Sequence, residues 1–239
     1  LTEEQPAFSF AVSPEHLRFE QAELDREAEE EGFRFRTFTD PFLERAAIQR
    51  AFAEFLLDRD TLLLHGSAVA LDGRGYLFTA RSGTGKSTHT RLWKQIFGDR
   101  AVMVNDDKPF LRVTDHGVLA CGSPWNGKHR LGTDIKVPLK AICILERGQE
   151  NSIVKIEPQD GLHMLLQQSN RPNDAKMLGT YLEMIDTIAQ GRTIKVAITH
   201  NHFDHTGAVR ELAAETGCDV YIQPEDLSMP PMLTGGPLH

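Results

Sequence analysis

The sequence predicts an α/β protein in which a mixed sheet is combined with helices. Two observations carry this prediction. Short apolar segments separated by glycine-containing turns recur from residue 61 onward, such as "TLLLHGSAVAL" and "YLFTA", and such segments are typical of strands. Segments with apolar residues at helical spacing lie between them, such as "RLWKQIFG" and "TYLEMIDTIAQG".

Residues 1–60 are predicted to form a strand and helices that pack on this core. The stretch 8–13, "FSFAVS", has the composition of a short strand. The charged stretch 13–32 fits a helix with a solvated face, or else a mobile linker. A helix is predicted over 40–60, with Asp40 as its N-cap.

The composition is that of an ordinary globular protein, with 40% hydrophobic and 25% charged residues among 239. The net charge of -8 argues against a nonspecific nucleic-acid binder, which needs a basic face. Its three cysteines form no C-x-x-C pair, as expected in a reducing compartment. No apolar run approaches the roughly 20 residues that span a bilayer, and no signal-peptide pattern opens the sequence. We therefore expect a cytoplasmic protein with no membrane contact.

The stretch "ARSGTGKST", residues 80–88, fits a phosphate-binding P-loop, with Ala80 where glycine is commoner. It follows a predicted strand and opens a predicted helix, so its backbone N–H groups and the helix N-terminus can surround phosphate oxygens. The lysine supplies a mobile cation, and the following serine can bind Mg²⁺. The predicted nucleotide-binding residues are Ser82, Gly83, Thr84, Gly85, Lys86, Ser87 and Thr88.

An apolar segment, "VMVNDD", delivers Asp106 and Asp107 at the end of a predicted strand. One carboxylate can bind Mg²⁺ together with Ser87, for which Asp106 is the candidate, and the other can accept a proton from an attacking hydroxyl. The residues alone do not decide which aspartate is the base. Paired aspartates are also common turn formers. His65 ends another strand and precedes the P-loop by the length of a hairpin, so it is a third candidate at the same sheet edge.

The linked stretches "LLLHGSAVALDGRGYLFTARSGTGKSTHTRLW" and "VMVNDDKP" resemble the serine kinases of the HPr kinase/phosphorylase type. The resemblance covers roughly residues 60–190 and implies a phosphoenolpyruvate carboxykinase-like P-loop kinase domain over 61–190. It implies ATP and Mg²⁺ as cofactors and transfer of the γ-phosphate to a serine hydroxyl of a small protein or peptide. It also implies that His65 orients the γ-phosphate or the acids.

The stretch "GVLACGSPWNGKHRLG" departs from that family, because it has no counterpart of the acidic metal-binding loop. It resembles instead a related group of small kinases that carry "SPWNGKHRL". Relatives in peptide-modification gene clusters phosphorylate serine on small peptides, so a peptide acceptor competes with HPr itself. Arg130 is the best candidate for a second phosphate-binding cation, and a solvated basic turn is the alternative. A homo-oligomer is left open.

A second signature, "THNHFDHTG", supplies His200, His202, Asp204 and His205. This spacing resembles the metal-binding motif of the metallo-β-lactamase fold, and it lies between a predicted strand and a predicted helix. The resemblance implies a partial metallo-β-lactamase-like tail over residues 191–239. That fold takes its remaining ligands from distant segments, and a catalytic zinc site needs three protein ligands and a water. We therefore expect weak Zn²⁺ binding or a structural tail.

Three hypotheses result. The first is an ATP-dependent serine kinase, the second is a nucleotide-binding regulatory module without catalysis, and the third is a zinc-dependent hydrolase fragment. The P-loop and the aspartate pair favour the first.

Overall fold

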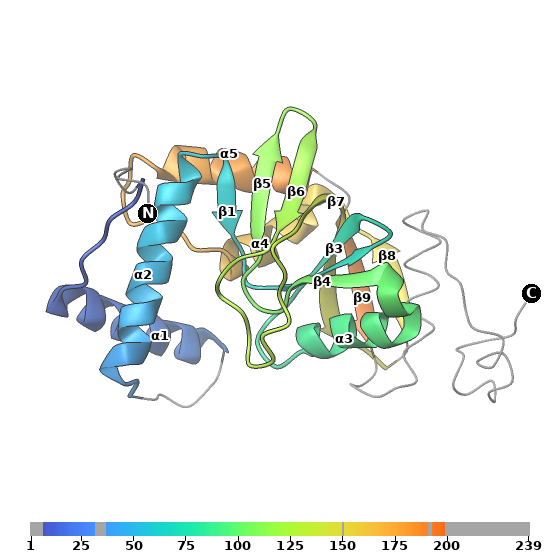
Figure 1. Cartoon of the computed structure of the whole chain (residues 1–239), viewed down its shortest axis with the longest axis horizontal. Coiled ribbons are helices and arrows are strands. Elements are labelled where there is room, and N and C mark those ends of the chain that lie inside the picture. Colours follow the sequence, from blue (N-terminus) through green and yellow to red (C-terminus); the bar gives the residue numbers. More distant parts are fainter. Residues whose placement is uncertain (1–6, 32–36, 150, 191–192, 199–239) are drawn as a thin grey trace, which may run out of the picture.

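The computed structural model describes residues 7–31, 37–149, 151–190 and 193–198, and it confirms the α/β prediction (Figure 1). The helices are α1 (Pro14–Glu31), α2 (Asp40–Leu57), α3 (Lys86–Phe97), the 3₁₀ turn η1 (Gly98–Arg100), α4 (Pro158–Gln168) and α5 (Leu178–Ala189). The strands are β1 (Thr61–Leu63), β2 (Ser67–Leu71), β3 (Arg74–Thr79), β4 (Ala101–Asn105), β5 (Phe110–Thr114), β6 (Gly117–Cys121), β7 (Lys136–Arg147), β8 (Ser152–Lys155) and β9 (Thr193–Ile198).

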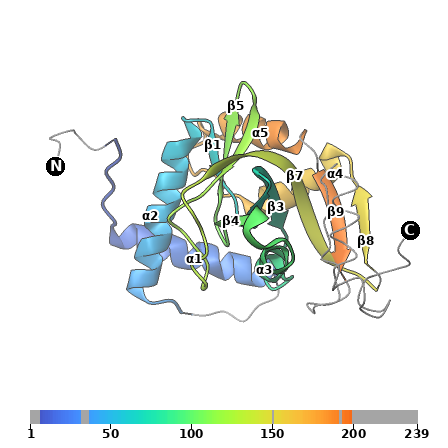
Figure 2. The same ribbon diagram turned by 45° about the vertical axis from the view of Figure 1, so that its right-hand side comes forward.

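The strands form one mixed sheet in the order β1-β5-β6-β7-β3-β2-β4, with β9 on β7 and β8 on β9. The long strand β7 joins its two parts. Residues 136–138 of β7 pair with β6, whereas residues 139–147 pair in parallel with β3 and β9. Figure 2 shows β7 curving from the β5–β6 side toward β9, so the sheet is curled.

Strands β2 and β3 and the central part of β7 are buried on both faces, and their residues alternate between two cores. On one face, Trp93 and Phe97 of α3 pack against Tyr76 and Phe78. The opposite core contains Leu77 and residues from α2, α4 and α5. Burial of these apolar side chains fixes α3, the helix that follows residues 80–85, against one face of the sheet.

The predicted strand 61–71 is wrong in one respect, because the chain breaks into β1 and β2 around His65. Gly66 packs closely at this break, because an added Cβ would lie 2.8 Å from Leu77 Cδ1 and 3.0 Å from the Phe78 carbonyl oxygen, so only glycine fits there. At the break, the His65 N–H donates to the Gln168 carbonyl and the Gly66 N–H to the Asp107 carbonyl, at 2.6 and 2.9 Å. The break therefore ties His65 to the end of β4.

Helices α1 and α2 lie together beside the sheet (Figure 1). The predicted helix over 13–32 is confirmed, and the predicted helix over 40–60 ends at Leu57, with Thr39 rather than Asp40 at the N-cap. The predicted strand over 8–13 is wrong. Phe8 packs its ring on Phe52 of α2 at 5.2 Å, so side-chain packing rather than strand pairing anchors this segment.

Strand β9 is part of the sheet and pairs in parallel with β7 over six residues. The sequence predicts three regions, 1–60, 61–190 and 191–239, and β9 belongs to the last of them. This division into regions stays a prediction. Among the described residues, no helix combines the length and the apolar character needed to cross a bilayer.

Candidate functional site

The P-loop connects β3 to α3 in the conformation that its sequence demands. Gly83 and Gly85 have φ angles of 76° and 115°, which lie in the left-handed region that favours glycine. The Thr84 hydroxyl donates to the Arg81 carbonyl at 2.9 Å and closes the turn. The first N–H groups of α3 have no partners within the helix and carry its positive dipole end. A loop with this geometry can receive an anion at the start of α3.

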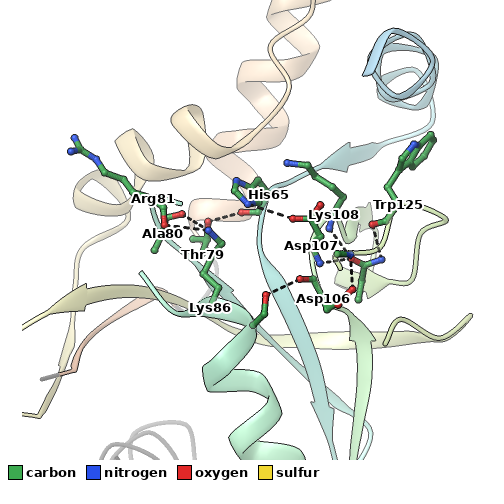
Figure 3. A network of polar contacts seen from close by, with 12 residues as sticks. His65, Thr79, Ala80, Arg81, Lys86, Asp106, Asp107, Lys108 and Trp125 are labelled. Carbon is green, nitrogen blue, oxygen red and sulfur yellow. Dashed lines mark hydrogen bonds and ion pairs between the residues drawn. The ribbon is translucent and has the colours of Figure 1, made fainter. Parts of the chain in front are cut away.

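Lys86, the first residue of α3, is only 8% exposed. Its ammonium donates to the Ala80 carbonyl at 2.8 Å and to the Arg81 carbonyl at 3.3 Å, so it lies over the loop (Figure 3). At the base of the loop, the Thr79 hydroxyl donates to the His65 carbonyl at 3.0 Å. These contacts hold a cation directly beside the loop amides.

Asp106, which follows β4, lies against the P-loop helix and is 2% exposed. The Ser87 hydroxyl donates to the Asp106 carbonyl at 3.1 Å, and Asp106 Oδ1 accepts the Gly127 N–H at 2.8 Å. Asp106 Oδ2 is buried and accepts no hydrogen bond from the part of the chain that the structure describes. A buried carboxylate oxygen without a donor fits a cation ligand, and the neighbouring hydroxyl fits as a second one.

Asp107 points away from Asp106 and toward His65, with 3.5 Å between Asp107 Oδ1 and His65 Nε2 (Figure 3). Desolvation raises the pKa of Asp107, and the neighbouring Asp106 adds to this against the opposing effect of Lys108. Desolvation also lowers the pKa of His65 well below 6.5, helped by Lys108 and Lys86. The imidazole is therefore neutral at pH 7, and Asp107 has a higher proton affinity than an ordinary aspartate.

The lowered pKa of His65 predicts acid sensitivity of folding. Below pH 6.5 the imidazole of the unfolded chain takes up a proton that the imidazole of the folded protein does not. The free energy of unfolding therefore decreases as the pH is lowered. One such proton contributes up to about 1.4 kcal/mol per pH unit. Urea titrations between pH 7.5 and 5.5 should show a smaller loss in His65→Gln than in wild type. His116→Gln, at an exposed turn, should match wild type, and an unchanged loss in His65→Gln would contradict the assignment.

Asn105 is a site residue that the sequence analysis missed. It is fully buried at the end of β4. Its Oδ1 accepts the N–H groups of Asp107 and Lys108 at 2.8 and 2.7 Å, and its amide donates to the Ser123 and Trp125 carbonyls at 3.2 and 3.3 Å. Asn105 therefore fixes the aspartate pair to the loop that follows β6. An asparagine before paired acids at a strand end was the only signal.

Replacing Asn105 by alanine should lower the free energy of unfolding by about 2–4 kcal/mol, because several buried backbone groups would lose their partners. Urea denaturation followed by tryptophan fluorescence measures the change, and Asn173→Ala, at an exposed position, should stay within about 0.5 kcal/mol of wild type. An Asn105→Ala protein as stable as wild type would show that the clamp is dispensable.

The site residues border one open cleft of about 840 Å³. Of the residues predicted from sequence, the structure brings together in its lining His65, Ser82, Gly83, Gly85, Lys86, Ser87, Thr88, Asp106, Asp107 and Arg130. Thr84 is absent from the lining, since its hydroxyl closes the loop turn instead. Arg130 has a left-handed φ of 50°, and its side chain is exposed.

The second predicted site, His200, His202, Asp204 and His205, lies outside the described residues. Within the described ranges, no group of three or more His, Cys, Asp or Glu side chains is arranged to hold a metal ion. Zn²⁺ binding by the C-terminal histidines therefore stays a prediction, which elemental analysis of the purified protein can test.

Comparison with protein-family models assigns the chain to a family. The family model described as "SynChlorMet cassette protein ScmC" matches residues 48–201, more than half of the sequence, and the chain belongs to this family. A second model, of the metallo-beta-lactamase superfamily, matches residues 189–238 and so overlaps the predicted histidine signature. No curated protein matches.

Among solved structures, the chain is similar to the HPr(Ser) kinase/phosphatase from Coxiella burnetii, with 10% sequence identity and a TM-score of 0.36. The match covers 65% of this chain and 98% of that one.

Proposed function

We propose that the protein binds ATP with Mg²⁺ at the P-loop and transfers the γ-phosphate to a serine hydroxyl of a small protein or peptide. The observation that carries this proposal is the meeting of the P-loop helix and the aspartate strand end. Ser87 contacts Asp106 at 3.1 Å, while Asp107 lines the same cleft as Lys86. Phosphoryl transfer depends mainly on positioning and charge stabilisation, and these residues supply both.

The two aspartates take different roles in this proposal. Asp106 and Ser87 would hold Mg²⁺, because Asp106 Oδ2 is buried without a donor and the Ser87 hydroxyl contacts the backbone carbonyl of the same residue. When bound, Mg²⁺ would neutralise charge on the β- and γ-phosphates. Asp107 is the base, because its raised pKa and its position toward His65 suit proton transfer from an alcohol.

In the reaction, Asp107 accepts the proton of the serine hydroxyl as the serine oxygen bonds to the γ-phosphorus. The bond from that phosphorus to the bridging oxygen breaks, and ADP leaves. The Lys86 ammonium moves from the loop carbonyls to the phosphate oxygens, where it stabilises the charge. Neutral His65 orients the Asp107 carboxylate without lowering its proton affinity as an imidazolium would.

The experiment is incubation of the purified protein with γ-labelled ATP and a cell extract, followed by mass-spectrometric identification of the labelled species. A protein or peptide labelled on serine, dependent on added Mg²⁺, is the expected result. Label found only as inorganic phosphate, or no label transfer with any extract fraction, would contradict serine phosphorylation.

A further inference from the structure

A second cavity adjoins the central cleft, and it is lined largely by α1 and α2. It has a volume of about 280 Å³. Four residues line both spaces and so form their boundary: Phe42, Arg45, Asp107 and Asn126. The proposed base is thus reached from the P-loop on one side and from the second cavity on the other.

Arg45 is the cation at this boundary. It is exposed, and its guanidinium forms no hydrogen bond or ion pair with another residue in the described ranges. Two other arginines are engaged, since Arg50 donates to Glu20 at 2.6 Å and Arg91 contacts His129 at 3.3 Å. Arg130 also forms no side-chain hydrogen bond or ion pair within the described ranges, but it lines only the central cleft and not the second cavity. Arg45 therefore has donors available for a ligand.

The packing of α2 holds Arg45 toward the site. Arg45, Gln49 and Phe52 are four and three residues apart, so they lie on one face of the helix. At the end of this stripe, the Phe52 ring packs on Trp125 at 5.5 Å and on Phe110 at 6.3 Å. These aromatic contacts anchor the face that carries Arg45 to the loop beside Asp107.

The ion pair between Arg50 and Glu20, which both line the second cavity, fixes α2 to α1. Helix α2 is therefore held both by α1 and by Trp125, and this packing sets where the backbone of Arg45 lies. Arg45 also precedes residues 48–201, the segment that the family model matches. It is a feature of the part of this chain outside that match.

We propose that the acceptor hydroxyl enters from the second cavity and that Arg45 binds the γ-phosphoryl group during its transfer at the boundary. This inference rests on the function proposed above. A guanidinium presents planar paired donors to phosphate oxygens, and its charge is worth most when the transferred group is between donor and acceptor. Lys86 binds the same group from the P-loop side, so two cations approach it from opposite walls.

The test requires no knowledge of the acceptor. Calorimetric titration measures the affinity for MgADP alone and for MgADP with fluoroaluminate, which imitates the phosphoryl group in transfer. Wild type should bind the fluoroaluminate complex much more tightly. Arg45→Ala should keep its affinity for MgADP but lose this gain by roughly 100-fold or more, since arginines that contact a transferred phosphoryl group have effects of this size or larger. Arg45→Lys should lose part of it.

Arg18→Ala removes an exposed arginine of α1 that lines neither space, and it should behave as wild type. A full fluoroaluminate gain in Arg45→Ala would overturn the role of Arg45, and so would an equal loss of MgADP affinity, which would assign it to ground-state nucleotide binding. Tight MgADP binding without any gain in wild type would also overturn it. Failure of wild type to bind MgADP would instead contradict the proposed function itself.

Discussion

Replacing Lys86 by methionine should lower kcat/KM for ATP turnover at least about 100-fold, which corresponds to about 2.7 kcal/mol of transition-state stabilisation. Methionine keeps the apolar stem of this buried side chain but removes the ammonium that lies over the loop. The loss is expected mainly in kcat, because the charge is needed most when the phosphoryl group is in transfer. Release of labelled phosphate or labelling of an acceptor measures it.

The matched control is Lys94→Met, which removes a lysine two turns along the same helix. Its ammonium donates to the Gly98 carbonyl at the exposed helix end, away from the cleft. This variant should keep wild-type turnover. Equal turnover in Lys86→Met and wild type would show that the P-loop has no role in ATP turnover.

Separate substitution of the two aspartates should give two different defects. Asp107→Asn should lose roughly 100- to 10,000-fold in label transfer while it keeps its affinity for MgADP, because only the base is removed. Asp106→Asn should need a much higher Mg²⁺ concentration for nucleotide binding. Asparagine retains an Oδ1 that can accept the Gly127 N–H, so this change removes charge with little effect on the loop.

Calorimetry at several Mg²⁺ concentrations, with a parallel assay of label transfer, separates the two defects. The reverse pattern, with Asp107→Asn altering the Mg²⁺ requirement and Asp106→Asn only the transfer, would exchange the assigned roles. A wild-type protein that binds MgADP but labels no acceptor would favour the nucleotide-binding regulatory module over the kinase.

The strand, glycine-containing turn and helix around residues 80–88 were predictable, because neighbouring residues determine them. Gly83 and Gly85 are needed for left-handed turns, and Lys86 opens a helix directly after them. A strand before the loop and a helix after it could be read within thirty residues. The end of β4 is also determined by neighbouring residues, so the position of the aspartate pair directly after a strand was predicted as well.

The different surroundings of the two aspartates were not predictable, because distant residues distinguish them. Gly127 donates to Asp106, and His65 lies beside Asp107. Both contacts depend on how the sheet brings separate loops to one edge. Asn105 was overlooked for the same reason, since its partners follow β6, and nothing in the spacing of Arg45 indicated that it would border the cleft.

The break at Gly66 was predicted only in part, because His65 was expected to end a strand while the whole run from 61 to 71 was also expected to be one strand. The apolar run from Thr61 to Leu71 has the composition of one continuous strand, but the structure divides it around His65, where Gly66 packs too closely on Leu77 and Phe78 for a side chain. Tertiary packing thus overrides local propensity at the point that places a histidine in the site.

The most direct test is a crystal structure of the protein with Mg²⁺ and a non-hydrolysable ATP analogue. The account predicts the β- and γ-phosphates against the backbone amides of residues 83–87, the Lys86 ammonium on their oxygens, and Mg²⁺ beside Ser87 and Asp106. A triphosphate bound elsewhere, or Lys86 still on the Ala80 carbonyl with nucleotide present, would contradict it.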